Sequence, residues 1–94
     1  HGIMPTAPPA QMPAVAEREE KAVAREIAGD AASEGGDKRE ALSCWAEALK
    51  IFSGWSMAGA AARVAAKMAS AEEALGENEA ACEHYEQAAN FYRK

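Results

Sequence analysis

Residues 36–52 read Gly-Asp-Lys-Arg-Glu-Ala-Leu-Ser-Cys-Trp-Ala-Glu-Ala-Leu-Lys-Ile-Phe, and this stretch decides the fold. Its apolar residues recur at the spacing of one helix face. They are Ala41, Leu42, Trp45, Ala48, Leu49 and Phe52. Asp37, followed three residues later by Glu40, is close to a capping box and predicts where the helix begins. The stretch therefore predicts an amphipathic helix with Trp45 in the core.

The same pattern returns 40 residues further along the chain. The corresponding pairs are Gly36 and Gly76, Ala41 and Ala81, Trp45 and Tyr85, Ala48 and Ala88, and Phe52 and Tyr92. A repeat of this length is typical of a pair of helices, and short connections imply antiparallel neighbours. We therefore expect an all-α fold of four antiparallel helices, arranged as two stacked helical hairpins at residues 14–53 and 56–94.

Apolar spacing and turn residues predict the remaining helices. The first is expected from Ala14 to Ser33, with an apolar stripe of Val15, Ala16, Val23, Ala24, Ile27 and Ala31. Gly54 is expected to cap the second helix and Ser56 to begin the third. The core face of the third helix is predicted to be Val64, Met68, Ala71 and Leu75. For the fourth, from about Asn78, the inward residues are predicted to be Ala81, Tyr85, Ala88, Ala89 and Tyr92.

Composition narrows the class of protein. The 94 residues suffice for one small domain, and a net charge of −5 argues against nucleic acid as a partner. The sequence has no run of 18 apolar residues, so we expect no integral membrane segment, and it has no signal-peptide pattern. With only two cysteines, a disulfide framework is not indicated. We expect a cytoplasmic protein.

All four prolines fall within residues 1–13. Proline disfavours a helix interior, and this segment has little to bury, so we expect a disordered tail before a helical domain at 14–94. Pro5-Thr6-Ala7-Pro8 resembles the late-domain motif that is read by the ubiquitin-variant domain of the sorting machinery. Four residues in such a tail also recur by chance, which is the interpretation that we favour.

The repeat carries a family resemblance. Each copy has a small residue seven before the turn glycine (Gly29, Ala69) and an alanine–aromatic–alanine pattern after it. Over residues 23–92 the chain resembles the tetratricopeptide family, although its period of 40 exceeds the usual spacing of about 34 residues and the closing proline is absent. The resemblance implies a non-catalytic interaction module, an adaptor or scaffold without a cofactor, that binds a peptide or amphipathic helix of a partner protein. The alternative is the three-helix microtubule-interacting-and-transport domain of the endosomal sorting machinery, which residues 14–75 would form.

Five residues are candidates for partner binding. Arg63 and Lys67 lie one turn apart, and the resemblance places them on a concave groove where some family members hold a carboxylate. Glu26 and Asp30 occupy the matching positions of the first helix. The interpretation that we favour is that these carboxylates pair with Arg63 and Lys67 across the helices. Trp55, in the loop between the hairpins, is either a partner anchor or, as we favour, a plug at the helix end.

Cys44, Cys82 and His84 raise the question of thiol or metal chemistry. Two cysteines and one histidine without a close pair do not form a zinc signature, and no base or oxyanion site accompanies them. We therefore expect no enzymatic activity and no metal.

The last predicted helix lacks a polar covering helix after it. Helical repeats usually need about three copies for stability, and this chain has two. The alternatives are a chain cut from a longer array, self-association through the last helix, or a partner packed on that helix. We expect a cut fragment that dimerises weakly through it.

Overall fold

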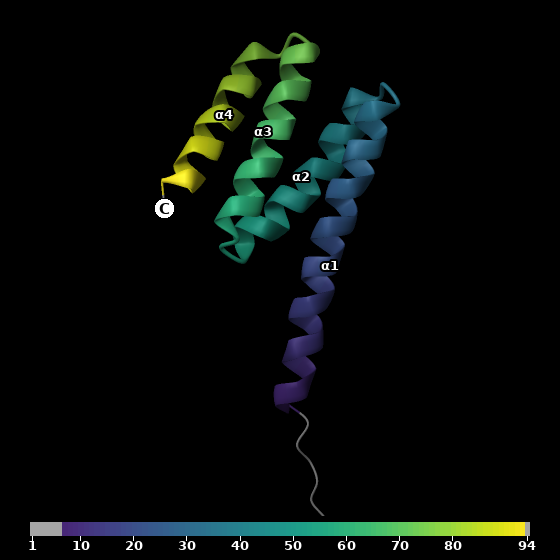
Figure 1. Ribbon diagram of the computed structural model, residues 1–94, viewed down its shortest axis with the longest axis vertical. Helices are drawn as coiled ribbons and strands as arrows, with labels where there is room; N and C mark the ends of the chain where they lie inside the picture. The colour runs from purple at the N-terminus through teal and green to yellow at the C-terminus, as the bar shows by residue number, and fades with distance from the viewer. Residues whose placement is uncertain (1–6, 94) are drawn as a thin grey trace, which may run out of the picture.

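The computed structural model describes the backbone of residues 7–93 and the side chains of residues 16–93. Residues 7–93 form four helices, with no strand among them: α1 (Ala7–Glu34), α2 (Lys38–Gly54), α3 (Ala58–Ala74) and α4 (Asn78–Tyr92). Each helix packs on the next one in the chain, α1 on α2, α2 on α3 and α3 on α4 (Figure 1). The predicted all-α stack of helical hairpins is confirmed.

The first helix is longer than predicted. It begins at Ala7 instead of Ala14, and Figure 1 shows its N-terminal half extending beyond the other three helices. Pro8 and Pro9 fall in its first turn, where a missing N–H leaves no helical bond unmade. Residues 1–6 of the predicted tail, with Pro5 and Thr6, lie outside the described residues. None of the helices in residues 7–93 combines the length and apolarity that a membrane span needs.

Three turns of identical length join the helices, and all three share one hydrogen-bond pattern. After α1, the N–H of Asp37 donates to the carbonyl of Ala32 at 2.9 Å, five residues back. The equivalent bonds join Met57 to Phe52 and Glu77 to Glu72 at 2.9 and 2.8 Å. Bonds of this span define the Schellman ending, which requires a residue with positive φ.

The positive-φ position is glycine in two turns and serine in the third. Gly36 and Gly76 have φ values of 93° and 80°, and Ser56 has 58°. Two predictions are thereby corrected. Gly54 is the last residue of α2 and does not form the turn, and Ser56 does not cap α3, because Met57 occupies that position. The predicted cap of α2 is confirmed, since Asp37 Oδ1 accepts the N–H of Glu40 at 3.0 Å.

The core is built largely from alanine, with few large side chains. Helix α2 lies between α1 and α3, and it buries Ala41, Cys44, Trp45, Ala48, Leu49 and Phe52. Trp45 is 4% exposed, as predicted. Its ring lies against Gly29 of α1, where an added Cβ would come within 2.5 Å of ring atoms. The predicted core face of α3 is confirmed for Val64, Met68 and Ala71, whereas Leu75 is only partly buried.

The predicted apolar stripe of α1 is wrong from Ala16 onward, and the side chain of Val15 lies outside the described residues. Val23 and Ile27 are 43% and 61% exposed, and the buried positions are Ala22, Glu26 and Gly29. The side of α1 next to α2 must carry a small residue where the Trp45 ring packs, and that residue is Gly29. Small residues therefore face inward, and the β-branched residues are left outside.

The predicted inward face of α4 is mostly wrong as well. Only Ala81 and Ala88 are buried, while Tyr85 and Tyr92 are 43% and 69% exposed. Among the helices in residues 7–93, only α3 packs extensively on α4, so the side of α4 away from α3 has no covering helix there.

Candidate functional site

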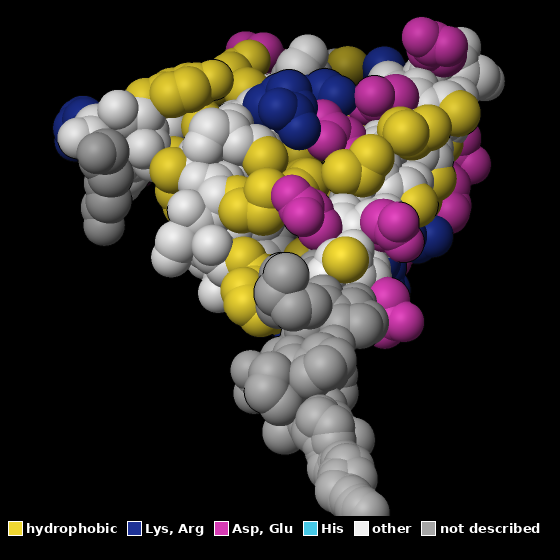
Figure 2. All heavy atoms as spheres, turned by 60° about the horizontal axis from the view of Figure 1, so that its bottom comes forward, with side chains coloured by type: hydrophobic (Ala, Val, Ile, Leu, Met, Phe, Trp, Pro, Cys, Tyr) yellow, Lys and Arg dark blue, Asp and Glu magenta, His cyan; other side chains and the backbone are white. Residues whose placement is uncertain are grey.

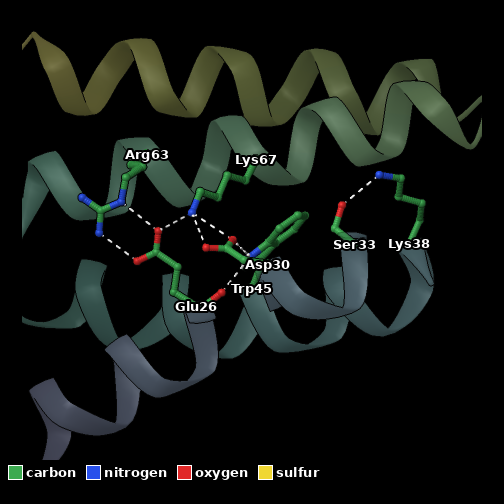
Figure 3. Close-up of polar contacts among 7 residues, drawn as sticks. All are labelled: Glu26, Asp30, Ser33, Lys38, Trp45, Arg63 and Lys67. Atoms are coloured by element: carbon green, nitrogen blue, oxygen red, sulfur yellow. Dashed lines mark hydrogen bonds and ion pairs between the residues drawn. The ribbon is translucent and has the colours of Figure 1, made fainter. Parts of the chain in front are cut away.

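An ion-pair cluster joins α1 to α3 on one side of the stack. The Nε and Nη2 atoms of Arg63 each donate at 2.8 Å to a different oxygen of Glu26 (Figure 3). The Nζ atom of Lys67 donates to Glu26 Oε2 at 2.8 Å and to both Asp30 oxygens at 2.9 and 3.0 Å. The predicted pairing across the helices is therefore present, and it brings together four of the five candidate residues.

The core tryptophan is part of the same hydrogen-bond network. The Nε1–H of Trp45 points at both the backbone oxygen of Glu26, 3.2 Å away, and Oδ1 of Asp30, 3.1 Å away (Figure 3). A buried indole N–H needs an acceptor, and α1 supplies two. The position of the ring thus fixes Asp30, and the salt bridges fix the spacing of α1 and α3.

Burial and charge hold Glu26 ionised. The residue is 6% exposed, whereas the side chain of Arg63 is 52% exposed. The hydrogen bond from Arg63 lowers the pKa of Glu26 from its usual 4.5 to about 2, with help from Lys67 and against the effect of burial. The same bond raises the pKa of Arg63. For Lys67, burial lowers the pKa, but the bonds from Glu26 and Asp30 outweigh it, and the net shift is upward.

The cluster is balanced in charge, with two carboxylates and two cations. A bidentate Arg–carboxylate pair is geometrically rigid, and removing one member leaves a buried charge without a partner. The arrangement can orient the two helices and present the half-exposed Arg63 guanidinium. It does not present an uncompensated positive site.

Exposed apolar side chains border the cluster on α1. Val23, Ile27 and their neighbours line a shallow hollow of about 450 Å³. The other lining residues are Ala16, Glu19, Glu20 and Ala24. Figure 2 shows one face of the molecule on which Lys, Arg, Asp and Glu side chains lie together with hydrophobic side chains on either side of them. This face combines a rigid polar centre with apolar borders.

Trp55 lies at the turn between α2 and α3 and is 44% exposed. The guanidinium of Arg18 lies 5.8 Å from the ring centroid, within the range of a cation–π contact. The ring also lines shallow hollows with Ile51 and Met57. It packs at the end of α2 and also presents about half of its surface to solvent, so neither sequence-based alternative describes it alone.

The thiols and histidine lie in separate surroundings. Cys44 is buried, which raises its pKa, and Cys82 is exposed on α4. His84 Nδ1 lies 2.7 Å from Oε1 of Glu72 on α3. In the part of the chain that the structure describes, no three potential ligands converge on a metal position.

The surface positions of Val23, Ile27, Tyr85 and Tyr92 do not follow from the sequence pattern. Periodicity locates an apolar face on a helix but does not show which neighbour covers it. The sequence of α1 did carry a signal for its inward side, because Gly29 and Glu26 lie on one face of the helix and Val23 lies on another.

Comparison with known protein families, with characterised proteins and with solved structures finds no match to this chain.

Proposed function

We propose that this chain is a non-catalytic interaction module, an adaptor that binds an amphipathic helix or peptide of a partner protein. One observation carries the proposal: large apolar side chains lie outside while alanine fills the core. Five of them are 43–69% exposed, namely Val23, Ile27, Trp55, Tyr85 and Tyr92. Exposed apolar surface rimmed by polar residues is typical of protein-binding sites.

The face of α1 beside the ion-pair cluster suits a partner helix. Val23 and Ile27 are one turn apart, which matches the i, i+4 anchors of an amphipathic helix laid across them. Glu19 and Glu20 rim the same hollow. The partner would therefore carry apolar anchors with basic residues beside them.

In this proposal the polar cluster supplies a rigid floor and fixes the register of the partner. Arg63 is held by both Glu26 oxygens, so a partner carboxylate would share this guanidinium and would not displace Glu26. Lys67 and Asp30 keep α1 and α3 at the spacing that the floor needs. Trp55, half exposed at the far turn, is a second apolar contact for a longer ligand.

The test is selection of helical peptides from a displayed library on the intact chain, followed by affinity measurements on variants. Selected peptides should carry apolar residues at i, i+4 with basic neighbours, and Ile27→Asp should weaken them about tenfold or more. Ala46→Asp, an exposed change on α2, is the matched control and should leave affinity unchanged. Equal affinity for Ile27→Asp and the intact chain would rule out this face.

A rival from another class is a thiol or zinc-dependent enzyme that uses Cys44, Cys82 and His84. These residues would have to share a site, whereas Cys44 is buried on α2 and Cys82 is exposed on α4. Metal analysis of the purified protein separates the classes. Stoichiometric bound zinc would contradict the adaptor proposal.

A further inference from the structure

The outer face of α4 carries the counterparts of residues that α2 uses against α3. On α2, Glu47 pairs with Arg25 and so marks the side towards α1. Leu42 and Leu49 lie roughly 150° further round the helix, and α3 is the other helix that packs on α2. The repeat places Cys82 and Ala89 at the same positions of α4.

On α4 the corresponding face has no covering helix among residues 7–93. His84 contacts Glu72 and so marks the side of α4 towards α3. The side away from Glu72 carries Cys82, Ala89 and Tyr92, all of which are exposed. Tyr85 is exposed too, but its hydroxyl donates to Glu73 of α3. The counterparts of Cys82, Ala89 and Tyr92 on α2 are Leu42, Leu49 and Phe52, of which Leu49 and Phe52 are buried.

A complementary face is exposed on α1. Ala24, Ala28 and Ala31 correspond by the repeat to Val64, Met68 and Ala71 of α3, all buried. On α1 the two outer alanines are exposed and Ala28 is partly buried. The α1 alanines thus form a ridge of small residues. A helix like α2, placed before α1 as α2 is placed before α3, would cover this ridge.

We propose that copies of this chain associate head to tail, the outer face of α4 in one copy packing on the Ala24–Ala28–Ala31 ridge of the next. The packing repeats the way α2 packs on α3 within the chain, so the occupant is specified by the internal interface. The large side chain of Tyr92 meets the small residues of the ridge, as large and small residues alternate in packed helices. This inference goes beyond partner binding. The ridge adjoins the hollow lined by Val23 and Ile27, with Ala24 common to both, whereas the outer face of α4 is a separate surface.

The strength and form of the association follow from the residues. Ala89 and Cys82 stand where α2 has two leucines, so the contact is weaker than the internal one. Each copy carries a net charge of −5, and salt should therefore strengthen association by screening repulsion. Because the two surfaces differ, each copy can bind two others, and the assembly continues beyond a dimer into a filament or a closed ring.

Two matched variants test the proposal by sedimentation at rising concentration. Ala31→Glu blocks the α1 ridge and Ala89→Glu blocks the α4 face; both replace exposed alanines with a helix-forming residue. Each should lower the association constant about tenfold or more, because a carboxylate would be buried without a partner. Ala46→Glu, on the exposed side of α2, adds the same charge and should associate like the intact chain.

Mixing the two blocked variants is the decisive step. Ala31→Glu keeps its α4 face and Ala89→Glu keeps its ridge, so the mixture should form a dimer and nothing larger. An intact chain that stays monomeric at millimolar concentration would overturn the proposal. Undiminished dimerisation of Ala31→Glu would overturn it too, since α4 would then pair with α4.

Cysteine crosslinking checks the register. Antiparallel packing like that of α2 on α3 places Cys82 of one copy beside position 31 of the next. Under mild oxidation Ala31→Cys should form chains linked through Cys82, whereas Ala24→Cys, about 10 Å further along α1, should not. Equal crosslinking of both variants, or Cys82–Cys82 links in the unmodified chain, would contradict this register.

Discussion

The hairpin of α1 and α2 and the hairpin of α3 and α4 follow one residue pattern and pack differently. Trp45 is 4% exposed, whereas its counterpart Tyr85 is 43% exposed. Phe52 is 1% exposed and its counterpart Tyr92 is 69% exposed. Helix α2 has neighbours on two sides, and α4 is covered on one. Burial in a repeat is therefore decided by the next helix as much as by the repeat's own residues.

A second difference lies at the helix crossing. Gly29 leaves room for the Trp45 ring, and the ring's N–H reaches acceptors on α1. In the second hairpin the same position is Ala69, which is fully buried. Tyr85 lies outside instead, with its hydroxyl bonded to Glu73 at 2.9 Å. The small residue and the aromatic thus act as a coupled pair, and changing one changes where the other sits.

The largest predicted contrast is between the two aromatics. Trp45→Ala should cost about 3–5 kcal/mol, the usual cost of truncating a buried large aromatic. Tyr85→Ala should cost under about 1 kcal/mol, because nearly half of the side chain is already in water. Urea unfolding of dilute protein measures both. Similar losses for the two variants would show that the hairpins pack alike.

The ion-pair cluster belongs to the first hairpin and α3, and it predicts a pH dependence. The pKa of Glu26 is lower in the folded protein than its usual 4.5, so the ionised carboxylate stabilises the fold above pH 4.5. That contribution, about 2–3 kcal/mol, should be lost as pH falls from 4.5 towards 2.

Glu26→Gln is the control for this pH dependence, because it keeps the shape and removes the titration. The difference in unfolding free energy between the two proteins should shrink across that pH window. A difference that is constant with pH would show that Glu26 is not held by charge. Other carboxylates titrate in both proteins and cancel in the comparison.

The sequence predicted the helices better than their faces. Asp37, Gly36 and Gly76 specify local backbone geometry, and the structure confirms the cap and both turns. Which side of α1 or α4 faces inward depends on contacts that are remote in the chain. Val23 has the spacing of a core residue, yet it lies outside because Gly29 admits Trp45 on another side.

The candidate site was predicted in part. Opposite charges, spaced one helical turn apart on each of two helices, predicted the Glu26–Arg63 and Asp30–Lys67 pairs, and the structure contains both. The contact of Lys67 with Glu26 and the two acceptors of the Trp45 N–H depend on side-chain orientation, which spacing does not specify. The role of these residues in partner binding stays a prediction.

The helix crossing offers a smaller contrast between two glycines. Gly29→Ala should cost about 1–3 kcal/mol, because its Cβ would lie 2.5 Å from atoms of the Trp45 ring and the core would have to shift. Gly59→Ala, in α3, meets nothing within 4 Å and should gain a few tenths to about 1 kcal/mol. Thermal unfolding of the two variants tests the coupled pair. A gain for Gly29→Ala would mean that the ring can move aside at little cost.

The smallest expected effect concerns the turn between the two hairpins. Its hydrogen bonds match those of the turns within the hairpins, but its positive-φ residue is Ser56 instead of glycine. A side chain in this conformation costs about 1–2 kcal/mol. Replacing it by glycine removes that cost, but the greater flexibility of glycine in the unfolded chain offsets part of the gain in stability. Ser56→Gly should therefore stabilise by up to about 1 kcal/mol and raise the melting temperature by a few degrees.

The reverse change in a hairpin turn is the matched control. Gly76 has a φ of 80° and the same bond pattern, so Gly76→Ser should lose about what Ser56→Gly gains. Opposite shifts of similar size would show that the three turns are energetically equivalent and that the hairpins differ only in helix packing. A loss on Ser56→Gly would show that the serine stabilises the inter-hairpin turn, and the difference between the hairpins would then extend to the connection that joins them.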